Sequence, residues 1–445
     1  MKRTRLAKFL IFGLLSQTII AFFPGVSSGL TIEEAVALAL KNNPDLQRQQ
    51  MNRALSEGDL SWKKSQNFGK IAVVASYGHY NLPRTLAPLT PASIFKDPTA
   101  VPSTQDLCAT GIMYEVPLFT GFAQQLSVKI AALEKEMVGA AIKLSREQLI
   151  YNVKTLYVKI LSLQVQKEAQ SEYHKALQGL YDDISFEVKL GKKARVEQLK
   201  AAADLENARV KTKQISGNIR IMKVSLAALL NIDTITTLEN FSVEIPAPDE
   251  TGHNKEIQEL ERYRSAALDV EKKARLVEKT NAVYYPQVTF NGFYGRNFGP
   301  NDSSNLNEGD WNNQEVWQAS VNLKWTVFDF GSRKTARQMA AVREQQSRRG
   351  RLKTELELKV SLSEAITKIE MAIDEFQSAE IELALTRETE IIEQTRFDKG
   401  AADMNDLLYA KARNQLALSR SITARYTYRN ACFYLDYLLE NGENK

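Results

Sequence analysis

Two very long stretches without proline constrain the fold of this chain more than any other feature. Residues 124–186 form the first stretch, and residues 333–397 form the second. Each predicts a single helix, and at 1.5 Å per residue the first would span roughly 90 Å. Gly191 and Gly400 follow the two stretches and predict turns, after which shorter helices return to about Leu229 and Leu439. The sequence therefore predicts two long helical hairpins.

The apolar pattern of the first long helix indicates what it packs against. Apolar residues recur every seven positions from Ile130 to Val165, and a second series with the same spacing runs from Ile142 to Leu163. The two series are offset by about 200° around the helix. Two apolar seams on opposite sides suit a helix with a neighbour on each side, as in a wall or ring of helices. The alternative is an ordinary bundle helix with one wide apolar face.

Strand-like segments interrupt this helical pattern. In residues 316–331, "VWQASVNLKWTVFDFG", apolar and polar side chains alternate strictly, and residues 287–298 alternate in the same way. Residues 71–82 and 106–119 are predicted as two further strands. Four strands are too few to close a barrel, whereas three copies of the chain would supply twelve. Apolar residues outside and polar residues inside are typical of an outer-membrane barrel, although a soluble sheet packed on helices also alternates.

The chain repeats this arrangement once. Gly121 and Gly331 close the second strand of each copy and lie 210 residues apart (331 − 121), and the turn glycines Gly191 and Gly400 lie 209 apart. This constancy predicts a duplicated strand-loop-strand and helical-hairpin unit. We predict four segments: a signal peptide at 1–28, a first repeat at 29–230, a connector at 231–255 and a second repeat at 256–445.

The start of the chain indicates export. A basic segment precedes the apolar run "FLIFGLLSQTIIAFF" and the small residues "GVSSG", which is typical of a secretory signal peptide; the alternative is a retained membrane anchor. No other apolar run reaches the roughly 18 residues of a transmembrane helix. Removing the four basic residues of the signal reduces the formal net charge from +5 to +1 (5 − 4), which gives little support for a nucleic-acid partner.

Sequence motifs for catalysis or cofactor binding are absent. The chain has no phosphate-binding loop, nucleophile elbow or dinucleotide fingerprint, and its three histidines lack metal-ligand spacing. We therefore expect no enzyme activity, no cofactor and no metal site. Cys108 is predicted on a strand and Cys432 on a helix face, as two buried free thiols, with a disulfide as the alternative.

Several motifs in a fixed order resemble the TolC-like outer membrane efflux proteins over essentially the whole mature chain. They are "LTIEEAVALALKNNPDL", in which Thr31 and Glu34 can form a capping box, "YYPQVTF" before a strand, "PLFTG" and "VFDFG" after strands, and the stretch from Phe397 to Ala410. The chain departs from the family pattern in two places. The first strand lacks the proline that Pro286 supplies in the second repeat, and Val188 occupies the place of Phe397.

This resemblance implies a mainly α-helical protein with a membrane β-barrel. In a homotrimer, a 12-stranded barrel in the outer-membrane lipid of a Gram-negative bacterium would continue into the periplasm as a 12-helix barrel. Such proteins are passive exit ducts of tripartite efflux or secretion systems, docked through a periplasmic membrane-fusion adaptor to an inner-membrane transporter. The alternative function is a periplasmic coiled-coil adaptor or scaffold without a pore.

The resemblance also implies two functional sites. Adaptor contacts are expected at the two hairpin turns, at Leu190, Gly191, Lys192, Lys399, Gly400 and Ala401. A periplasmic gate is expected just inside them. Asp406 lies six residues after Gly400 and matches an acidic position of the family, Glu197 is its counterpart after Gly191, and Tyr409 occupies the family's second acidic position. The alternative role of Asp406 is to complement a helix dipole.

Overall fold

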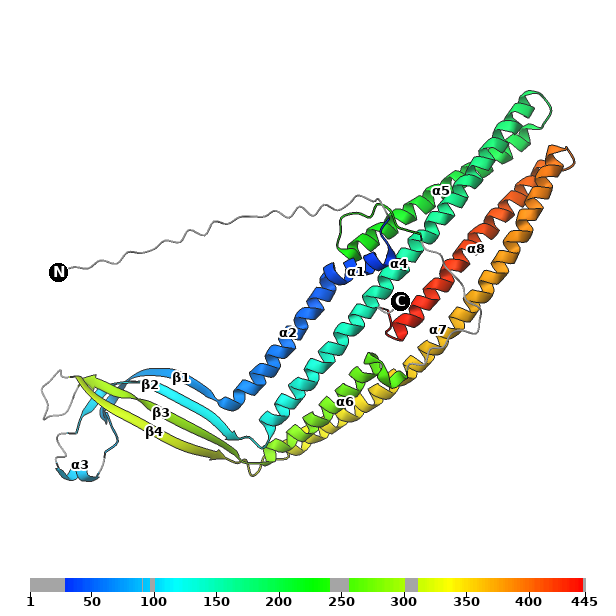
Figure 1. Ribbon diagram of the computed structural model, residues 1–445. Helices are drawn as coiled ribbons and strands as arrows, with labels where there is room; N and C mark the ends of the chain where they lie inside the picture. Colours follow the sequence, from blue (N-terminus) through cyan, green and yellow to red (C-terminus); the bar gives the residue numbers. More distant parts are fainter. Residues whose placement is uncertain (1–28, 90, 97–100, 241–255, 301–310, 443–445) are drawn as a thin grey trace, which may run out of the picture.

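The chain forms an elongated molecule with a small sheet at one end and long helices extending from it (Figure 1). The computed structural model describes residues 29–89, 91–96, 101–240, 256–300 and 311–442. The predicted signal peptide, and all of the predicted connector beyond residue 240, lie outside these residues. None of the described helices is both long and apolar enough to cross a membrane.

The helices follow the predicted pattern. Two helices, α4 and α7, each span 67 residues, which is roughly 100 Å. The described helices are α1 (Ile32–Asn42), α2 (Pro44–Ser65), α3 (Pro91–Lys96), α4 (Ala123–Lys189), α5 (Arg195–Leu230), α6 (Glu261–Thr280), α7 (Ser332–Asp398) and α8 (Met404–Leu438). At the start of α1, the capping box is present, because Thr31 Oγ1 accepts the Glu34 N–H while the Glu34 carboxylate accepts the Thr31 N–H.

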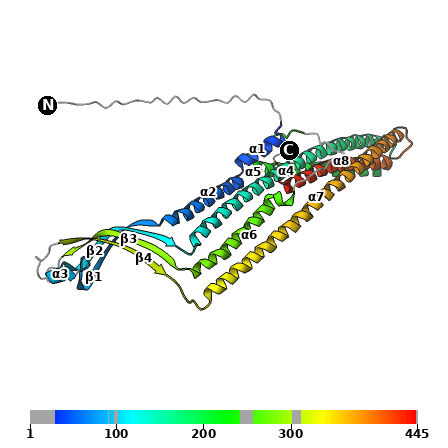
Figure 2. The same cartoon turned by 60° about the horizontal axis from the view of Figure 1, so that its bottom comes forward.

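Helix α4 lies inside a curved wall of helices, as its two apolar seams predict. It packs between α5 and α8 toward the hairpin turns and between α2 and α6 toward the sheet, and α7 follows beyond α8 and α6 (Figure 2). Residues of both seams are buried or half-buried, including Ile130 and Val158 of the first and Leu149 and Leu163 of the second. Helix α4 therefore has a neighbour on each side.

Helix α6, the first α-helix after the connector, begins at Glu261, five residues after the predicted start of the second repeat at residue 256. The carboxylate of Glu440, at the far end of the chain, accepts hydrogen bonds from the backbone N–H groups of Glu261 (2.6 Å) and Arg262 (3.2 Å). These are N–H groups of the first turn, which have no partner within a helix. The start of α6 thus coincides with a cap supplied by the C-terminal segment, which no local sequence signal reveals.

The four strands form one antiparallel sheet in the order β1-β2-β3-β4. Their bounds are β1 (Lys70–Thr85), β2 (Ser103–Phe119), β3 (Gln287–Pro300) and β4 (Trp311–Lys324). The link between the two repeats is the pairing of β2 with β3, for example Ile112 with Tyr294. Strands β1 and β4 form the two edges of the sheet.

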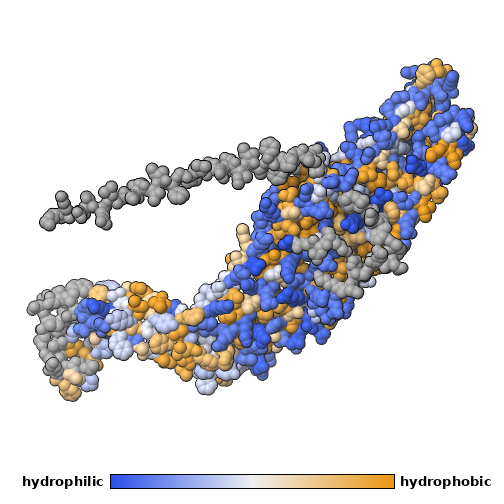
Figure 3. Space-filling view, viewed as in Figure 1, coloured by the Kyte–Doolittle hydropathy of each residue, from blue (hydrophilic) through white to orange (hydrophobic). Residues whose placement is uncertain are grey.

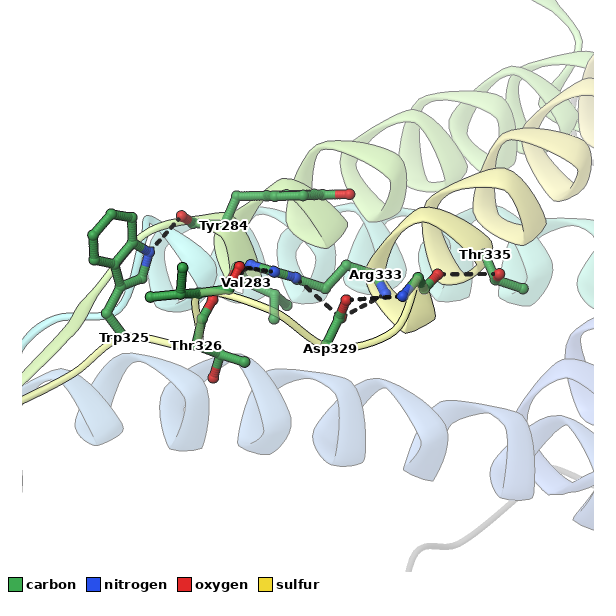
Figure 4. A network of polar contacts seen from close by, with 9 residues as sticks. Val283, Tyr284, Trp325, Thr326, Asp329, Arg333 and Thr335 are labelled. Atoms are coloured by element: carbon green, nitrogen blue, oxygen red, sulfur yellow. Dashed lines mark hydrogen bonds and ion pairs between the residues drawn. The ribbon is translucent and has the colours of Figure 1, made fainter.

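The predicted extent of the last strand was wrong, because β4 ends at Lys324 instead of continuing to Gly331. Gln287, the first residue of β3, pairs with Lys324, so no partner strand remains beyond this point. The Arg333 guanidinium instead donates to the carbonyl groups of Thr326 (2.9 Å) and Val327 (3.0 Å), and it pairs with Asp329 (3.0 Å; Figure 4). The chain thereby turns from the sheet into α7.

The two predicted repeats align at an offset of 209 residues both at the hairpin turns and at the junctions before the long helices, although Gly121 and Gly331 themselves lie 210 residues apart. Each junction between strand and long helix contains two successive residues with positive φ: Gly121 (62°) and Phe122 (70°) in the first repeat, Phe330 (53°) and Gly331 (90°) in the second. The residues preceding the helices, Phe122 and Gly331, lie 209 apart (331 − 122), as do the turn glycines. The glycine is therefore the first residue of the pair in one junction and the second residue in the other.

The two cysteines are only partly as predicted. Cys108 lies on β2 and Cys432 on α8, and neither cysteine forms a disulfide, in agreement with the prediction. Both are half-buried rather than buried.

Candidate functional site

The two hairpin turns have the same backbone geometry. Gly191 and Gly400 adopt φ of 72° and 69°, a left-handed conformation that glycine reaches without strain. The N–H of Gly191 donates to the Val188 carbonyl (3.0 Å), and the N–H of Lys192 donates to the Glu187 carbonyl (2.9 Å). The second turn repeats both bonds, from Gly400 to Phe397 and from Ala401 to Arg396. Both are Schellman motifs, which satisfy the last carbonyl groups of the long helices.

The two turns share one hydrophobic core. Leu177 and Ile184 of α4 pack there with Met404 and Leu407 of α8. Polar contacts also join the hairpins. The Lys193 ammonium lies 4.5 Å from the centre of the Phe397 ring, and Lys200 donates to Asn405 Oδ1 (3.3 Å). The structure therefore brings the six predicted docking residues to one end of the molecule, opposite the sheet (Figure 1).

The predicted gate residues begin the two returning helices. Glu197 is half-buried in the first turn of α5, Asp406 is exposed in the first turn of α8, and Tyr409 is 68% exposed one turn further along α8. Asp406 and Tyr409 are three residues apart and share a helix face. The contact of Lys200 with Asn405 shows that the two helix starts are neighbours.

Asp403 is the N-cap of α8, a role that the sequence interpretation missed. Its carboxylate caps α8 by accepting the N–H of Asp406 (3.0 Å), and this bond is the main reason that the pKa of Asp403 is below its ordinary value. The usual signal, an aspartate just before a helix, was present in the sequence. Because Asp403 caps the helix, the Asp406 carboxylate is not required for that role.

One face of the sheet is apolar and exposed. The register places Ile71, Val73, Ile112, Tyr294, Trp317, Val321 and Leu323 on the same face, and all of them are more than half exposed. Most of the opposite face is polar along β4, with Gln318, Ser320 and Asn322. Within the described residues, no helix packs extensively on either face of the sheet. Apolar residues gather along the sheet and its junction with the helices (Figure 3).

This exposed face is unlike that of a soluble sheet packed on helices, because no described part of the chain covers it. Monomeric soluble proteins rarely expose a contiguous apolar surface of this kind. An apolar outer face and a polar inner face, on strands with two open edges, fit a segment of a membrane barrel. Within the described residues, no cluster of histidine, cysteine or acidic side chains could hold a metal ion.

The comparisons with known proteins agree with this geometry. The family model described as outer membrane efflux protein matches residues 35–231 and 257–439. Among solved structures, the CmeC outer membrane channel of Campylobacter jejuni is similar with a TM-score of 0.79 and 15% identity, covering 95% of this chain and 90% of that chain. The outer membrane protein VceC of Vibrio cholerae has a TM-score of 0.76 and 14% identity, covering 92% and 96%.

A third similar structure is the open state of the MtrE outer membrane channel of Neisseria gonorrhoeae. Its TM-score is 0.72 and its identity 14%, and the match covers 92% of this chain and 89% of that chain. No curated protein sequence matches the chain. The matches at this level of identity establish the fold, while the family model covers most of the chain.

Proposed function

Because the chain belongs to the outer membrane efflux protein family, we propose that it is the exit duct of a tripartite efflux or secretion system. Members of this family are outer-membrane channels of Gram-negative bacteria and not enzymes, as we expected from the sequence. The finer proposal is a passive homotrimer. It docks to a periplasmic adaptor, and through that adaptor to an inner-membrane transporter that supplies the energy.

The exposed apolar face of the sheet carries this proposal. Strands β1 and β4 leave two open edges, and unpaired backbone groups are costly in lipid. Pairing β1 of one copy with β4 of the next satisfies both edges. Three copies give twelve strands, a number large enough to leave a lumen. The same rotation would bring three curved walls of helices together as a tunnel.

We expect the full-length protein, extracted from outer membranes in mild detergent, to be a trimer. The open sheet edges provide the physical reason, since each needs a partner strand. Light scattering should give three times the chain mass, and gel migration should change on heating. A monodisperse monomer that retains its strands by circular dichroism would contradict the barrel.

The gate is proposed at the starts of α5 and α8. A threefold axis would turn Asp406 into a ring of three carboxylates, and such rings attract cations and repel anions in a narrow pore. In the described structure the Asp406 side chain is exposed and takes part in no ion pair. Tyr409 occupies the position of the family's second acidic residue. The constriction would therefore carry less negative charge than one with two rings of carboxylates.

Replacing Asp406 by asparagine should weaken cation selectivity and reduce block by multivalent cations in planar-bilayer recordings. Thermal stability should change little, because Asp403 caps the helix. Glu388→Gln is the matched control, since it removes one exposed carboxylate per chain from α7. Unchanged selectivity with a stability loss of up to about 1 kcal/mol would instead assign Asp406 a helix-dipole role.

A further inference from the structure

Helix α7 carries opposite net charges in its two parts. Residues 332–353, the part next to the sheet, contain eight basic side chains and one acidic side chain, a net charge of +7 (8 − 1). Residues 354–398 contain four basic and twelve acidic side chains, a net charge of −8 (4 − 12). The equivalent of the basic segment in α4, residues 123–144 at the offset of 209, has three basic and two acidic side chains, a net charge of +1 (3 − 2). The basic segment, residues 332–353, is therefore particular to the second repeat.

The charges of the basic segment are not needed to form the helix. The N-terminal end of an α-helix already carries a partial positive charge, so basic side chains in the first turn, such as Lys334, are placed unfavourably there. Helix α4 reaches the same length of 67 residues with a net charge of only +1 in the equivalent segment. A role in binding explains the charges better than a role in folding.

Half of the basic side chains in the segment are available to a partner. Three of the eight form ion pairs near their own position on the helix, for example Arg348 with Glu344, and Arg351 lies over the ring of Tyr263. The four that are exposed and form no ion pair within the described part of the chain are Lys334, Arg337, Arg343 and Arg349.

The helix geometry directs these cations to two opposite sides of α7. Ala340 is buried, and Ser347, seven residues further on the same side, donates a hydrogen bond to Asp269 of α6 (2.6 Å). This side of α7 therefore faces α6. Arg337 and Arg343 lie three residues before and three residues after Ala340, which turns them by about 60° in opposite directions from that side.

One of these two directions is the interior of the proposed tunnel. Near the sheet, the wall is one helix thick in the order α2, α4, α6 and α7, so α7 forms its edge (Figure 2). The side of α7 away from α6 exposes Val342 (54%) and Leu356 (54%), and in a trimer it would meet the next copy. The two remaining sides face the tunnel and the surroundings. Either Arg337 or Arg343 then faces the tunnel, and a threefold axis makes it a ring of three.

We propose that the basic segment of α7 makes the tunnel electropositive near the membrane and binds multivalent organic anions there. This inference rests on the proposed function and specifies the charge of the cargo that the outer part of the duct favours. Rings of cations in a pore attract anions and repel cations. The proposed acidic gate lies beyond the other end of α7, roughly 80 Å from Arg343. Charges at that distance are screened from each other, since the Debye length is about 8 Å at physiological ionic strength.

The test uses planar-bilayer recordings of the full-length protein with Asp406→Asn as a common background, which removes the proposed acidic ring. The probe is benzenehexacarboxylate, a multivalent organic anion, added on the side of the strand loops. It should block the current, and the block should weaken as the KCl concentration rises, because salt screens the attraction. Absence of any block in a conducting channel would overturn the proposal.

Two matched variants locate the binding region. Arg337→Glu and Arg343→Glu reverse the same charge at exposed positions symmetric about Ala340. One of them should weaken the anion block about tenfold or more and shift the reversal potential in a KCl gradient toward K⁺ selectivity, while the other should stay within about twofold. Arg337→Gln and Arg343→Gln should show the same order with smaller effects, and they replace the glutamate variants if those fail to assemble.

The remaining outcomes separate the possible failures. Equal effects of both substitutions would mean that overall charge, rather than a tunnel-facing side chain, attracts the anion, and would overturn the proposal. No effect of either would place the free cations outside the tunnel, for example against lipid head groups, and would overturn it as well. In both cases a conducting trimer leaves the proposed function intact. An unmodified protein that forms neither trimer nor channel overturns the proposed function and this inference with it.

Discussion

Replacing Val321 by arginine should prevent the channel from folding into a bilayer, whereas the same replacement at the adjacent Ser320 should not. Val321 pairs with Phe290 on the exposed apolar face, between Leu323 and Trp317, and is 62% exposed. Ser320 pairs with Asn291 on the opposite, polar face. An arginine facing lipid near the middle of a barrel costs about 2–4 kcal/mol, and a trimer contains three.

The measurement is the fraction of protein that acquires heat-modifiable migration after dilution from urea into phospholipid vesicles. Ser320→Arg is the matched control, because it adds the same side chain one residue away on the same strand. Val321→Arg should remain almost entirely unfolded, while Ser320→Arg should fold nearly as the unmodified protein does. Equal folding of the two variants would show that the apolar face does not contact lipid.

The second large effect is expected at Gly121. A Cβ atom on Gly121 would lie 2.3 Å from the carbonyl oxygen of Ala282, and the residue has a positive φ of 62°. Gly331, the glycine of the second junction, also has a positive φ. A Cβ atom added to Gly331, however, would have no neighbouring atom within 4 Å. Phe330, the structural counterpart of Gly121, already carries a large side chain at a φ of 53° and is 93% exposed.

We therefore expect Gly121→Ala to destabilise each chain by about 2–5 kcal/mol, which combines left-handed strain with overpacking. Gly331→Ala should cost only about 1–2 kcal/mol, because strain is its single contribution. Thermal melting of the detergent-solubilised protein, followed by circular dichroism, compares the two. Similar losses of stability in both variants would show that the Ala282 carbonyl moves aside.

The sequence by itself predicted the elements whose signals are local. Helix α4 was expected from residue 124 to 186 and runs from Ala123 to Lys189, because no proline breaks a consistently apolar pattern. The glycine turns and the capping box depend on residues within six positions of each other, so they too could be identified in advance. The family resemblance then supplied the class of protein, which the family match confirms.

The structure shows where the predicted docking residues lie, whereas their role in docking stays a prediction. The docking residues meet at one end of the molecule because two helices of 67 residues end together, a consequence of the repeat that the sequence already contained. The capping role of Asp403 was also recognisable but was missed. Lys189, Lys192 and Arg195 form no ion pair within the described part of the chain. This could not be predicted, since it depends on which acidic residues the other hairpin brings near.

Only the tertiary structure decided where several elements end. Alternation continues past Lys324, yet β4 stops there because β3 offers no further partner and Arg333 takes the next carbonyl groups. The start of α6 coincides with capping by Glu440, about 180 residues away in the chain. In each case a group distant in sequence supplies or withholds a backbone hydrogen bond. The sequence thus determined which segments are helix or strand, and tertiary contacts determined where they stop.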